Sequence, residues 1–271
     1  MRTGAFGWSD DGLLVLSPLP GIGLREAVNN AGAGACSPDQ LWDLLERLPD
    51  AVSGLPRRAP WAANAGHYAE VIGVSLPMRR GWARALAASV ETALAGRDAG
   101  DEPVHGDFYE AQVLVDAGRI TGLLDVDTVG PGHRVDDLGC LLGHLSVLAT
   151  MDGAVGAGVT DAVQQWSPWF DHHVDPRELR AVAAGVTLSL ATGPFRTQDH
   201  GWEQATERRL GPVERWLEAA ETAGLPDLRD LSSSTPRHLM SGDRGRCRRG
   251  GERQRPCRGH GSIGRTGALS R

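Results

Sequence analysis

The sequence predicts an α+β fold in which a small amount of sheet is followed by a mostly helical body. Two observations indicate this class. Two pairs of short strand-like runs each flank a turn sequence, and the chain beyond Gly132 carries repeated helix-start signals. The 271 residues are 41% hydrophobic, which is enough for a substantial core. The composition excludes collagen, coiled coils and disulfide scaffolds.

Both predicted hairpins consist of apolar runs separated by turn-forming residues. Residues 5–8 and 13–17 flank the sequence Ser-Asp-Asp-Gly, and residues 113–115 and 120–126 flank Asp-Ala-Gly-Arg. Pro18 opens a stretch rich in proline and glycine after the first hairpin. We therefore expect an irregular linker there.

Helices are predicted where a capping residue precedes an amphipathic run. One spans residues 38–48 after Ser37 and another spans 176–190 after Asp175, each with proline at its first position. A third spans 79–94 and places its large apolar side chains on one face. Further helices are expected over residues 136–148, 202–210 and 212–223, the last two being separated at Gly211-Pro212.

Charge is distributed unevenly along the chain. All 28 basic residues are arginine, against 34 acidic residues, for a formal net charge of −6. Residues 232–271 hold ten of these arginines, with two acidic residues and few large apolar side chains. We expect this basic tail to be disordered, and not to bind nucleic acid, because no aromatic side chain is interleaved for base stacking. The absence of lysine excludes Schiff-base chemistry.

Nothing in the sequence suggests a membrane partner or a disulfide framework. No stretch of about 18 apolar residues is present, and no basic segment leads into an apolar run near the start. We expect a soluble cytoplasmic protein. Cys140 and His144 share one helix face, and we interpret Cys140 as a small buried side chain rather than a nucleophile.

Polar residues suited to phosphoryl chemistry gather in one window. His-Gly-Asp at residues 105–107 is followed by Gln112 and, after the second hairpin, by Asp125 and Asp127. Because a hairpin folds the chain back on itself, Asp107, Gln112 and Asp125 can converge at one end. Phosphoryl transfer requires a carboxylate that accepts a proton and oxygen ligands for a hard cation. Each carboxylate taken singly could be a turn residue, but the ordered set favours a site.

Three segments carry a resemblance to a known family. His105–Gln112 resembles the H-G-D-x-x-x-x-N catalytic loop of aminoglycoside phosphotransferases and related small-molecule kinases. Leu123–Asp127 is similar to their I-D-x-[DEG] metal-binding segment, and Arg134–Leu138 to the R-x-x-D-L that follows it. The resemblance implies a protein-kinase-like fold and the phosphorylation of a small-molecule hydroxyl, with ATP and Mg²⁺ as cofactors.

The resemblance also implies roles for individual residues. Asp107 would be the catalytic base for the acceptor hydroxyl, and His105 would brace its loop. Asp125 would hold Mg²⁺, with Gln112 and Asp127 as further metal ligands. These five side chains form the predicted catalytic and metal site.

Other matched residues would support or extend that site. Asp137 would anchor the catalytic loop, and Ser17 and Leu19 resemble part of the hinge that contacts adenine. The sequence departs from the family pattern at Gln112, where asparagine is usual, and in having no lysine for the nucleotide. Only 104 residues precede His105, so the small lobe is expected to be truncated. The predicted units are a small-lobe remnant at 1–22, a large lobe at 23–231 and the tail at 232–271.

Two other functions remain open. A non-catalytic remnant of the kinase fold would also lack the lysine. A metal-dependent phosphohydrolase is the second, and its candidate residues are His105, Asp107, Asp125, Asp127, His133 and His144. Acidic residues between Asp171 and Glu221 would suit a cationic acceptor, although an ordinary charged helix surface explains them equally well.

Overall fold

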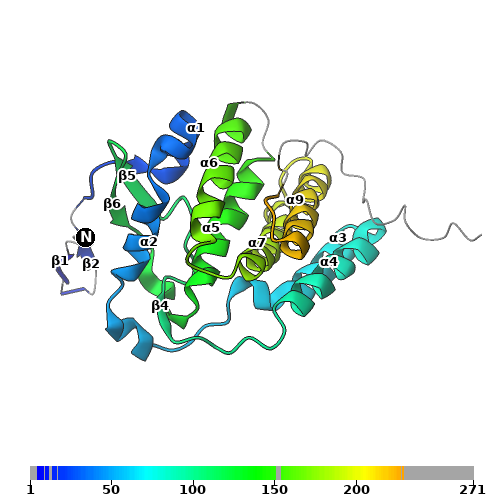
Figure 1. Cartoon of the computed structure of the whole chain (residues 1–271), viewed down its shortest axis with the longest axis horizontal. Helices are drawn as coiled ribbons and strands as arrows, with labels where there is room; N and C mark the ends of the chain where they lie inside the picture. Colours follow the sequence, from blue (N-terminus) through cyan, green and yellow to red (C-terminus); the bar gives the residue numbers. More distant parts are fainter. Residues whose placement is uncertain are drawn as a thin grey trace, which may run out of the picture. The chain divides into compact units, whose positions relative to one another are not determined.

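Helices make up most of the described chain, and the strands form three small antiparallel sheets (Figure 1). The helices are α1 (Leu24–Ala31), α2 (Pro38–Glu46), α3 (Ala65–Ser75), α4 (Arg80–Ala93), α5 (Arg134–Leu148), α6 (Ala154–Phe170), α7 (Pro176–Ala191), α8 (Gly193–Thr197) and α9 (Trp202–Thr222). The strands are β1 (Ala5–Trp8), β2 (Leu14–Leu16), β3 (Ile22–Gly23), β4 (Glu102–Val104), β5 (Val113–Asp116), β6 (Arg119–Leu123) and β7 (Gly130–Gly132). Short 3₁₀ turns occupy Gly32–Ala35, Asp50–Gly54, Trp61–Asn64, Pro77–Arg79 and Val126–Thr128. The predicted α+β class is confirmed.

The structure is a computed structural model that describes residues 5–8, 10–11, 14–16, 18–150, 154–226 and 228. These residues belong to one compact unit, Met1–Pro236. The predicted basic tail lies outside the described residues, so its expected disorder stays a prediction. No helix in the described ranges combines the length and apolarity needed to cross a bilayer.

Both predicted hairpins are present, and the sheets contain pairings that the sequence did not indicate. β1 pairs with β2, and β5 pairs with β6. β3 adds to the outer side of β5, with Ile22 opposite Val115, so the order in this sheet is β3-β5-β6. β4 pairs with β7, whose sequence Gly-Pro-Gly carries no strand signal. This last pairing brings the segment before His105 beside the segment after Asp127.

Most helix predictions are confirmed, with a difference at one cap. Asp175 accepts hydrogen bonds from the backbone N–H groups of Arg177 and Glu178, as expected of a capping residue. Ser37 precedes α2 but makes no such bond. Its hydroxyl instead accepts from Gln40 Nε2 at 3.1 Å. The same glutamine accepts from the Ile120 N–H of β6 at 3.1 Å, so it joins α2 to the sheet.

The predicted break at Gly211-Pro212 is wrong, because α9 runs without interruption from Trp202 to Thr222. A proline inside a helix removes one backbone hydrogen bond and crowds the preceding turn. Burial offsets this cost here. Pro212 and Val213 are buried, and Trp216 is fully buried with its Nε1 donating to Ser146 Oγ at 2.7 Å. Tertiary packing therefore overrides the local signal.

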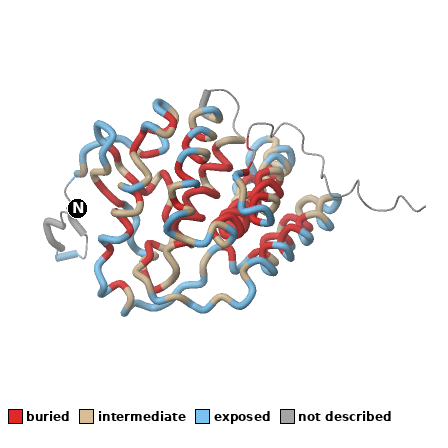
Figure 2. The backbone as a smooth tube through the Cα atoms, in the orientation of Figure 1, coloured by how far each residue is buried: buried red, intermediate tan, exposed pale blue. Residues whose placement is uncertain are grey.

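The helical core is centred on α5 and α7, most of whose residues are buried (Figure 2). α7 packs against both α5 and α9. Close approach of α5 and α7 requires glycine at position 143, where a Cβ atom would lie 2.9 Å from Val186. Arg180 of α7 is fully buried, and its Nη2 donates to Asp171 Oδ2 at 2.7 Å. This packing makes α5 a rigid support for the loop that precedes β5.

Candidate active site

The predicted site residues lie on two loops that flank the β5–β6 hairpin. His105, Asp107 and Gln112 precede β5, whereas Asp125 and Asp127 follow β6. Hydrogen bonds connect the loops. The His105 ring nitrogen Nε2 lies 2.9 Å from the carbonyl oxygen of Leu124, and Gln112 Nε2 donates to Asp125 Oδ2 at 3.0 Å. The fold thus brings the two loops together at one end of the hairpin.

Asp137 of α5 holds the backbone of the predicted catalytic loop. Its Oδ2 accepts from the His105 N–H at 2.7 Å, and its Oδ1 accepts from the Gly106 N–H at 2.8 Å. Burial raises the pKa of Asp137 from 3.8 to about 7, although the two N–H donors oppose this shift. Gly106 has a φ of +83°, and a Cβ there would lie 2.6 Å from the Thr128 carbonyl oxygen. Both features constrain the path of the loop through Asp107.

A second anchor comes from α1, which the sequence did not predict. The Glu110 side chain is fully buried, and Arg25 Nε and Nη2 donate to its Oε1 at 2.9 and 2.7 Å. Burial raises the pKa of Glu110 against the opposing effect of Arg25. The two residues are 85 positions apart, and α1 is a helix of eight residues. No local pattern in the sequence signals such a contact.

Asp107 is partly buried between several polar partners. Its Oδ1 accepts from Trp61 Nε1 at 3.1 Å, and Cys140 Sγ lies 4.0 Å from the same oxygen. Burial raises the pKa of Asp107, while His105 and the Trp61 hydrogen bond lower it. Burial also lowers the pKa of His105, which favours a neutral ring. Sequence reasoning missed Trp61, because it lies on a separate 3₁₀ turn 46 residues away.

The predicted metal-binding segment is more exposed than the loop of Asp107. Asp125 and Asp127 are both exposed, and Asp125 adopts a left-handed backbone with φ of 56° and ψ of 57°. Arg58 Nη2 donates to the Asp127 carbonyl oxygen at 2.9 Å. Carboxylate and amide oxygens are the ligands that Mg²⁺ prefers. Gln112 turns Nε2 toward Asp125, so its amide must rotate to present oxygen to a shared cation.

A different trio forms a close cluster. One ligand atom each from Asp107, Cys140 and His144 lies within 4.8 Å of the other two. Within the described part of the chain, the phosphohydrolase residues proposed from the sequence do not form such a cluster with one another. The His144 ring stacks on Tyr109 at a centroid distance of 4.2 Å. Burial, with Arg25 and Arg209, lowers the pKa of His144 to about 3.

Of the two residues predicted to contact adenine, the structure describes Leu19 alone. Ser17 lies outside the described residues. Leu19 is partly buried and packs on β6, where a Cβ at Gly122 would collide with its side chain. Pro20 is tied to the same strand, because its carbonyl oxygen accepts from Thr121 Oγ1 at 2.6 Å. The linker after the first hairpin therefore lies against the sheet.

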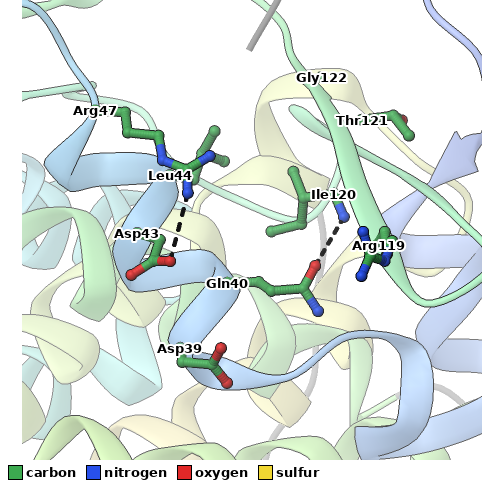
Figure 3. A pocket seen from close by; sticks show the side chains of 9 residues that line it. All are labelled: Asp39, Gln40, Asp43, Leu44, Arg47, Arg119, Ile120, Thr121 and Gly122. Atoms are coloured by element: carbon green, nitrogen blue, oxygen red, sulfur yellow. Dashed lines mark hydrogen bonds and ion pairs between the residues drawn. The ribbon is translucent and has the colours of Figure 1, made fainter.

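A pocket of about 420 Å³ opens between α2 and β6 (Figure 3). Charged residues on its rim include Asp43, Arg47 and Arg119, and Gln40 bridges its two walls. None of the catalytic or metal residues predicted from the sequence lines it. A second pocket, of about 330 Å³, lies beside the loop of Asp107, and its lining includes Arg58, Trp61, Gly106 and Thr128.

Comparison with known proteins identifies the fold. Residues 7–180 match the phosphotransferase enzyme family (APH). A choline/ethanolamine kinase family protein from Mesorhizobium loti is similar in structure, with a TM-score of 0.55 and 15% identity over 82% of this chain and 77% of that one. This similarity confirms the predicted protein-kinase-like fold.

Two phosphotransferases are structural matches with lower TM-scores. A thermostable mutant of aminoglycoside phosphotransferase APH(4)-Ia, in complex with AMP-PNP and hygromycin B, has a TM-score of 0.44 and 16% identity over 81% of this chain and 75% of that one. Macrolide 2′-phosphotransferase MphH from Brachybacterium faecium has a TM-score of 0.37 and 20% identity over 78% and 73%. No curated protein matches the sequence. Since the family match spans well over half of the chain, the protein belongs to the phosphotransferase enzyme family.

Proposed function

We propose that this protein is a cytoplasmic, ATP-dependent phosphotransferase that acts on a small-molecule hydroxyl. Family membership supports the reaction class. The observation that carries the proposal is the junction of the two loops. Gln112 Nε2 lies 3.0 Å from Asp125 Oδ2, and His105 bridges to the Leu124 carbonyl, so the Asp107 loop and the metal segment share one end of the hairpin.

In this proposal Asp107 accepts the proton of the acceptor hydroxyl. Partial burial raises its pKa, which makes the carboxylate a stronger base than an exposed aspartate. Asp137 and Glu110 hold the loop so that the base is positioned before the acceptor arrives. His105, buried beneath the loop, keeps that position by contacting the chain after β6.

The oxygen donors after β6 fit a hard cation. Asp125 and Asp127 are exposed carboxylates, and Gln112 adds an amide oxygen if its side chain rotates. These three residues would hold Mg²⁺, which supplies neutralisation of the phosphate charge when it is bound. Leu19, and Ser17 beside it in the sequence, would contact the adenine.

One observation favours a second candidate function. The sequence contains no lysine at all, so no lysine amine is present to hold the nucleotide phosphates. A chain with this fold and without that group could be a non-catalytic member of the family. Arginine carries the only fixed side-chain positive charge here, and its planar geometry differs from that of lysine.

Calorimetric titration with Mg·ATP separates the two functions. We expect saturable binding to the full chain, and its loss in Asp125→Ala. Asp116→Ala is the matched control, because Asp116 is an exposed carboxylate at the turn of the same hairpin. Absence of heat at millimolar nucleotide would rule out an active kinase and favour the non-catalytic function.

The role of Asp107 needs a separate measurement. Transfer of the γ-phosphate to a panel of aminoglycosides, amino alcohols and sugars should fall by about 10²–10⁴-fold in Asp107→Asn. Binding of Mg·ATP should persist in this variant, because Asp107 is proposed to contact the acceptor. Full activity of Asp107→Asn with any acceptor would show that another group is the base.

A further inference from the structure

The trio of Asp107, Cys140 and His144 combines a carboxylate, a thiol and an imidazole, whereas the proposed magnesium site has oxygen donors alone. Cys140 and His144 project from the same face of α5, one turn apart, and Asp107 reaches them from the catalytic loop. Cys140 is almost completely buried, with 2% of its surface exposed, and its sulfur lies 4.0 Å from Asp107 Oδ1. Among the described residues, this is where a sulfur, an imidazole and a carboxylate meet.

Ligand chemistry indicates which cation would suit this trio. Thiolate and imidazole bind borderline or soft metals such as Zn²⁺, whereas Mg²⁺ requires oxygen ligands. Catalytic zinc sites commonly use three protein ligands and leave a fourth position open. The Gln112 and Asp125 site supplies oxygen only. The two sets of residues therefore select different metals.

The geometry is close to what such a metal needs. Tetrahedral zinc with ordinary bond lengths places its ligand atoms about 3.5 Å apart. The three ligand atoms here lie within 4.8 Å of one another. Side-chain rotation must therefore shorten the distances between these atoms by roughly 1 Å. His144 is held in place by stacking on Tyr109, and its ring makes no hydrogen bond among the described residues. The ring is therefore available as a ligand.

We propose that Asp107, Cys140 and His144 form a second cation site, for a thiophilic divalent metal of the Zn²⁺ class. Binding replaces the thiol proton, which leaves to solvent as the sulfur–metal bond forms. The metal also occupies a carboxylate oxygen of Asp107. If Asp107 is the catalytic base, as the proposed function holds, then an occupied site cannot accept the proton of the acceptor hydroxyl. The site would therefore inhibit the enzyme.

Cobalt spectroscopy tests the site without requiring activity. Cys247 and Cys257 lie outside the described residues, and the parent chain for this experiment carries Cys247→Ser and Cys257→Ser so that no thiol of this segment contributes to the signal. Titration of this parent with Co²⁺ should produce the near-ultraviolet charge-transfer band of a sulfur–cobalt bond. Zn²⁺ should abolish the band by displacement, and excess Mg²⁺ should leave it unchanged.

Single substitutions assign the ligands. Cys140→Ser should remove the band, and Cys36→Ser should keep it, because Cys36 is the other buried free cysteine of the described chain and lies outside the cluster. His144→Gln should weaken Zn²⁺ binding by more than the roughly 100-fold that loss of an outer partner costs. If Cys140→Ser fails to fold, the loss of Zn²⁺ affinity in His144→Gln tests the site instead. A parent chain without the band, or a band that persists in Cys140→Ser, would overturn the proposal.

Inhibition is measured separately once an acceptor is known. Micromolar Zn²⁺ should suppress phosphoryl transfer by the parent chain, and any activity retained by His144→Gln should resist the same concentration. If no transfer occurs under any condition, the proposed function fails while the cobalt band still decides the metal site. If transfer occurs and Zn²⁺ has equal effects on both chains, the inhibitory role is wrong.

Discussion

The loop of Asp107 and the segment of Asp125 lie at the same end of one hairpin, yet the protein holds them differently. The first is fixed by Asp137 from α5 and by Arg25 from α1, and much of it is buried. The second is exposed, and its backbone is held by Arg58 through the Asp127 carbonyl. The comparison shows one carboxylate, that of Asp107, positioned in advance by the core, beside carboxylates left open to solvent; under the proposed function these are the base and the side where a nucleotide and its cation would arrive.

Breaking the first anchor should have the largest effect. Asp137→Asn leaves one of the two loop N–H groups facing an NH₂ group, and an unsatisfied buried donor costs about 1–3 kcal/mol. We expect a corresponding fall in the free energy of unfolding, measured in urea, and a loss of phosphoryl transfer. Asp136→Asn is the control, because Asp136 pairs with Arg97 and not with the loop. Equal losses in both variants would contradict a specific anchoring role.

The same residue predicts a pH dependence of stability. The pKa of Asp137 is raised from 3.8 to about 7 in the folded protein. Between these two values of pH, the folded state therefore holds a proton that the unfolded state has released. Its contribution to stability is therefore complete below about pH 4 and is lost as the pH rises through about 7. Unfolding measured across this window should show a decline for the native chain. The decline should be smaller in Asp137→Asn.

Breaking the second anchor should have a smaller effect. Arg25→Met leaves the buried Glu110 carboxylate without its partner, but Arg25 is half exposed, so we expect a loss of about 1–2 kcal/mol. The loss should appear in thermal or urea unfolding. Arg47→Met is the control, since the exposed pair of Arg47 with Asp43 is worth at most about 0.5 kcal/mol. A neutral result for Arg25→Met would show that the Arg25 side chain does not hold the loop, leaving the backbone hydrogen bond from the Arg25 N–H to the Glu110 carbonyl oxygen as the contact of α1.

At the junction of the loops, Gln112→Ala removes one hydrogen bond to an exposed carboxylate and also truncates a buried side chain, so we expect a loss of about 1–2 kcal/mol in the free energy of unfolding. It should also weaken Mg²⁺-dependent binding of ATP in calorimetry. Gln165→Ala is the control for the hydrogen bond alone, since Gln165 is exposed and also donates to an exposed aspartate, Asp161. Unchanged magnesium dependence in Gln112→Ala would remove Gln112 from the metal site.

The subtlest test concerns the hydrogen bond from Trp61 to Asp107. This bond lowers the pKa of Asp107, so Trp61→Phe should raise that pKa further. A base must be ionised to act, and the acidic limb of the profile of kcat/KM against pH should therefore move to higher pH. Trp202→Phe, which alters a tryptophan packed on Phe195, should leave the limb in place. A shift to lower pH would contradict the assignment of Asp107 as base.

Local patterns in the sequence were sufficient for several elements. The hairpins followed from turn residues between apolar runs, and α2 and α7 followed from proline after a capping residue. The spacing from Asp107 to Gln112 and on to Asp125 predicted the junction of the two loops. These inferences succeed because hairpins and helix starts depend on residues only a few positions apart.

Other elements were missed because their signals are short or ambiguous. α1 has only eight residues and follows a stretch rich in proline and glycine, and β7 consists of glycine and proline. α9 continues through Gly211-Pro212 because buried contacts outweigh the lost backbone hydrogen bond. In each case, packing against distant residues decides the local conformation.

The sequence by itself determined the class of fold, the order of the polar residues around the β5–β6 hairpin and the family resemblance that order carries. Only the tertiary structure decided what surrounds Asp107: the indole of Trp61, the sulfur of Cys140 and the ring of His144. It also decided that Arg25 reaches Glu110 across 85 positions. The physical reason is that backbone periodicity and turn geometry are set by neighbouring residues, whereas burial, pKa shifts and ligand clusters arise when helices from distant parts of the chain pack together.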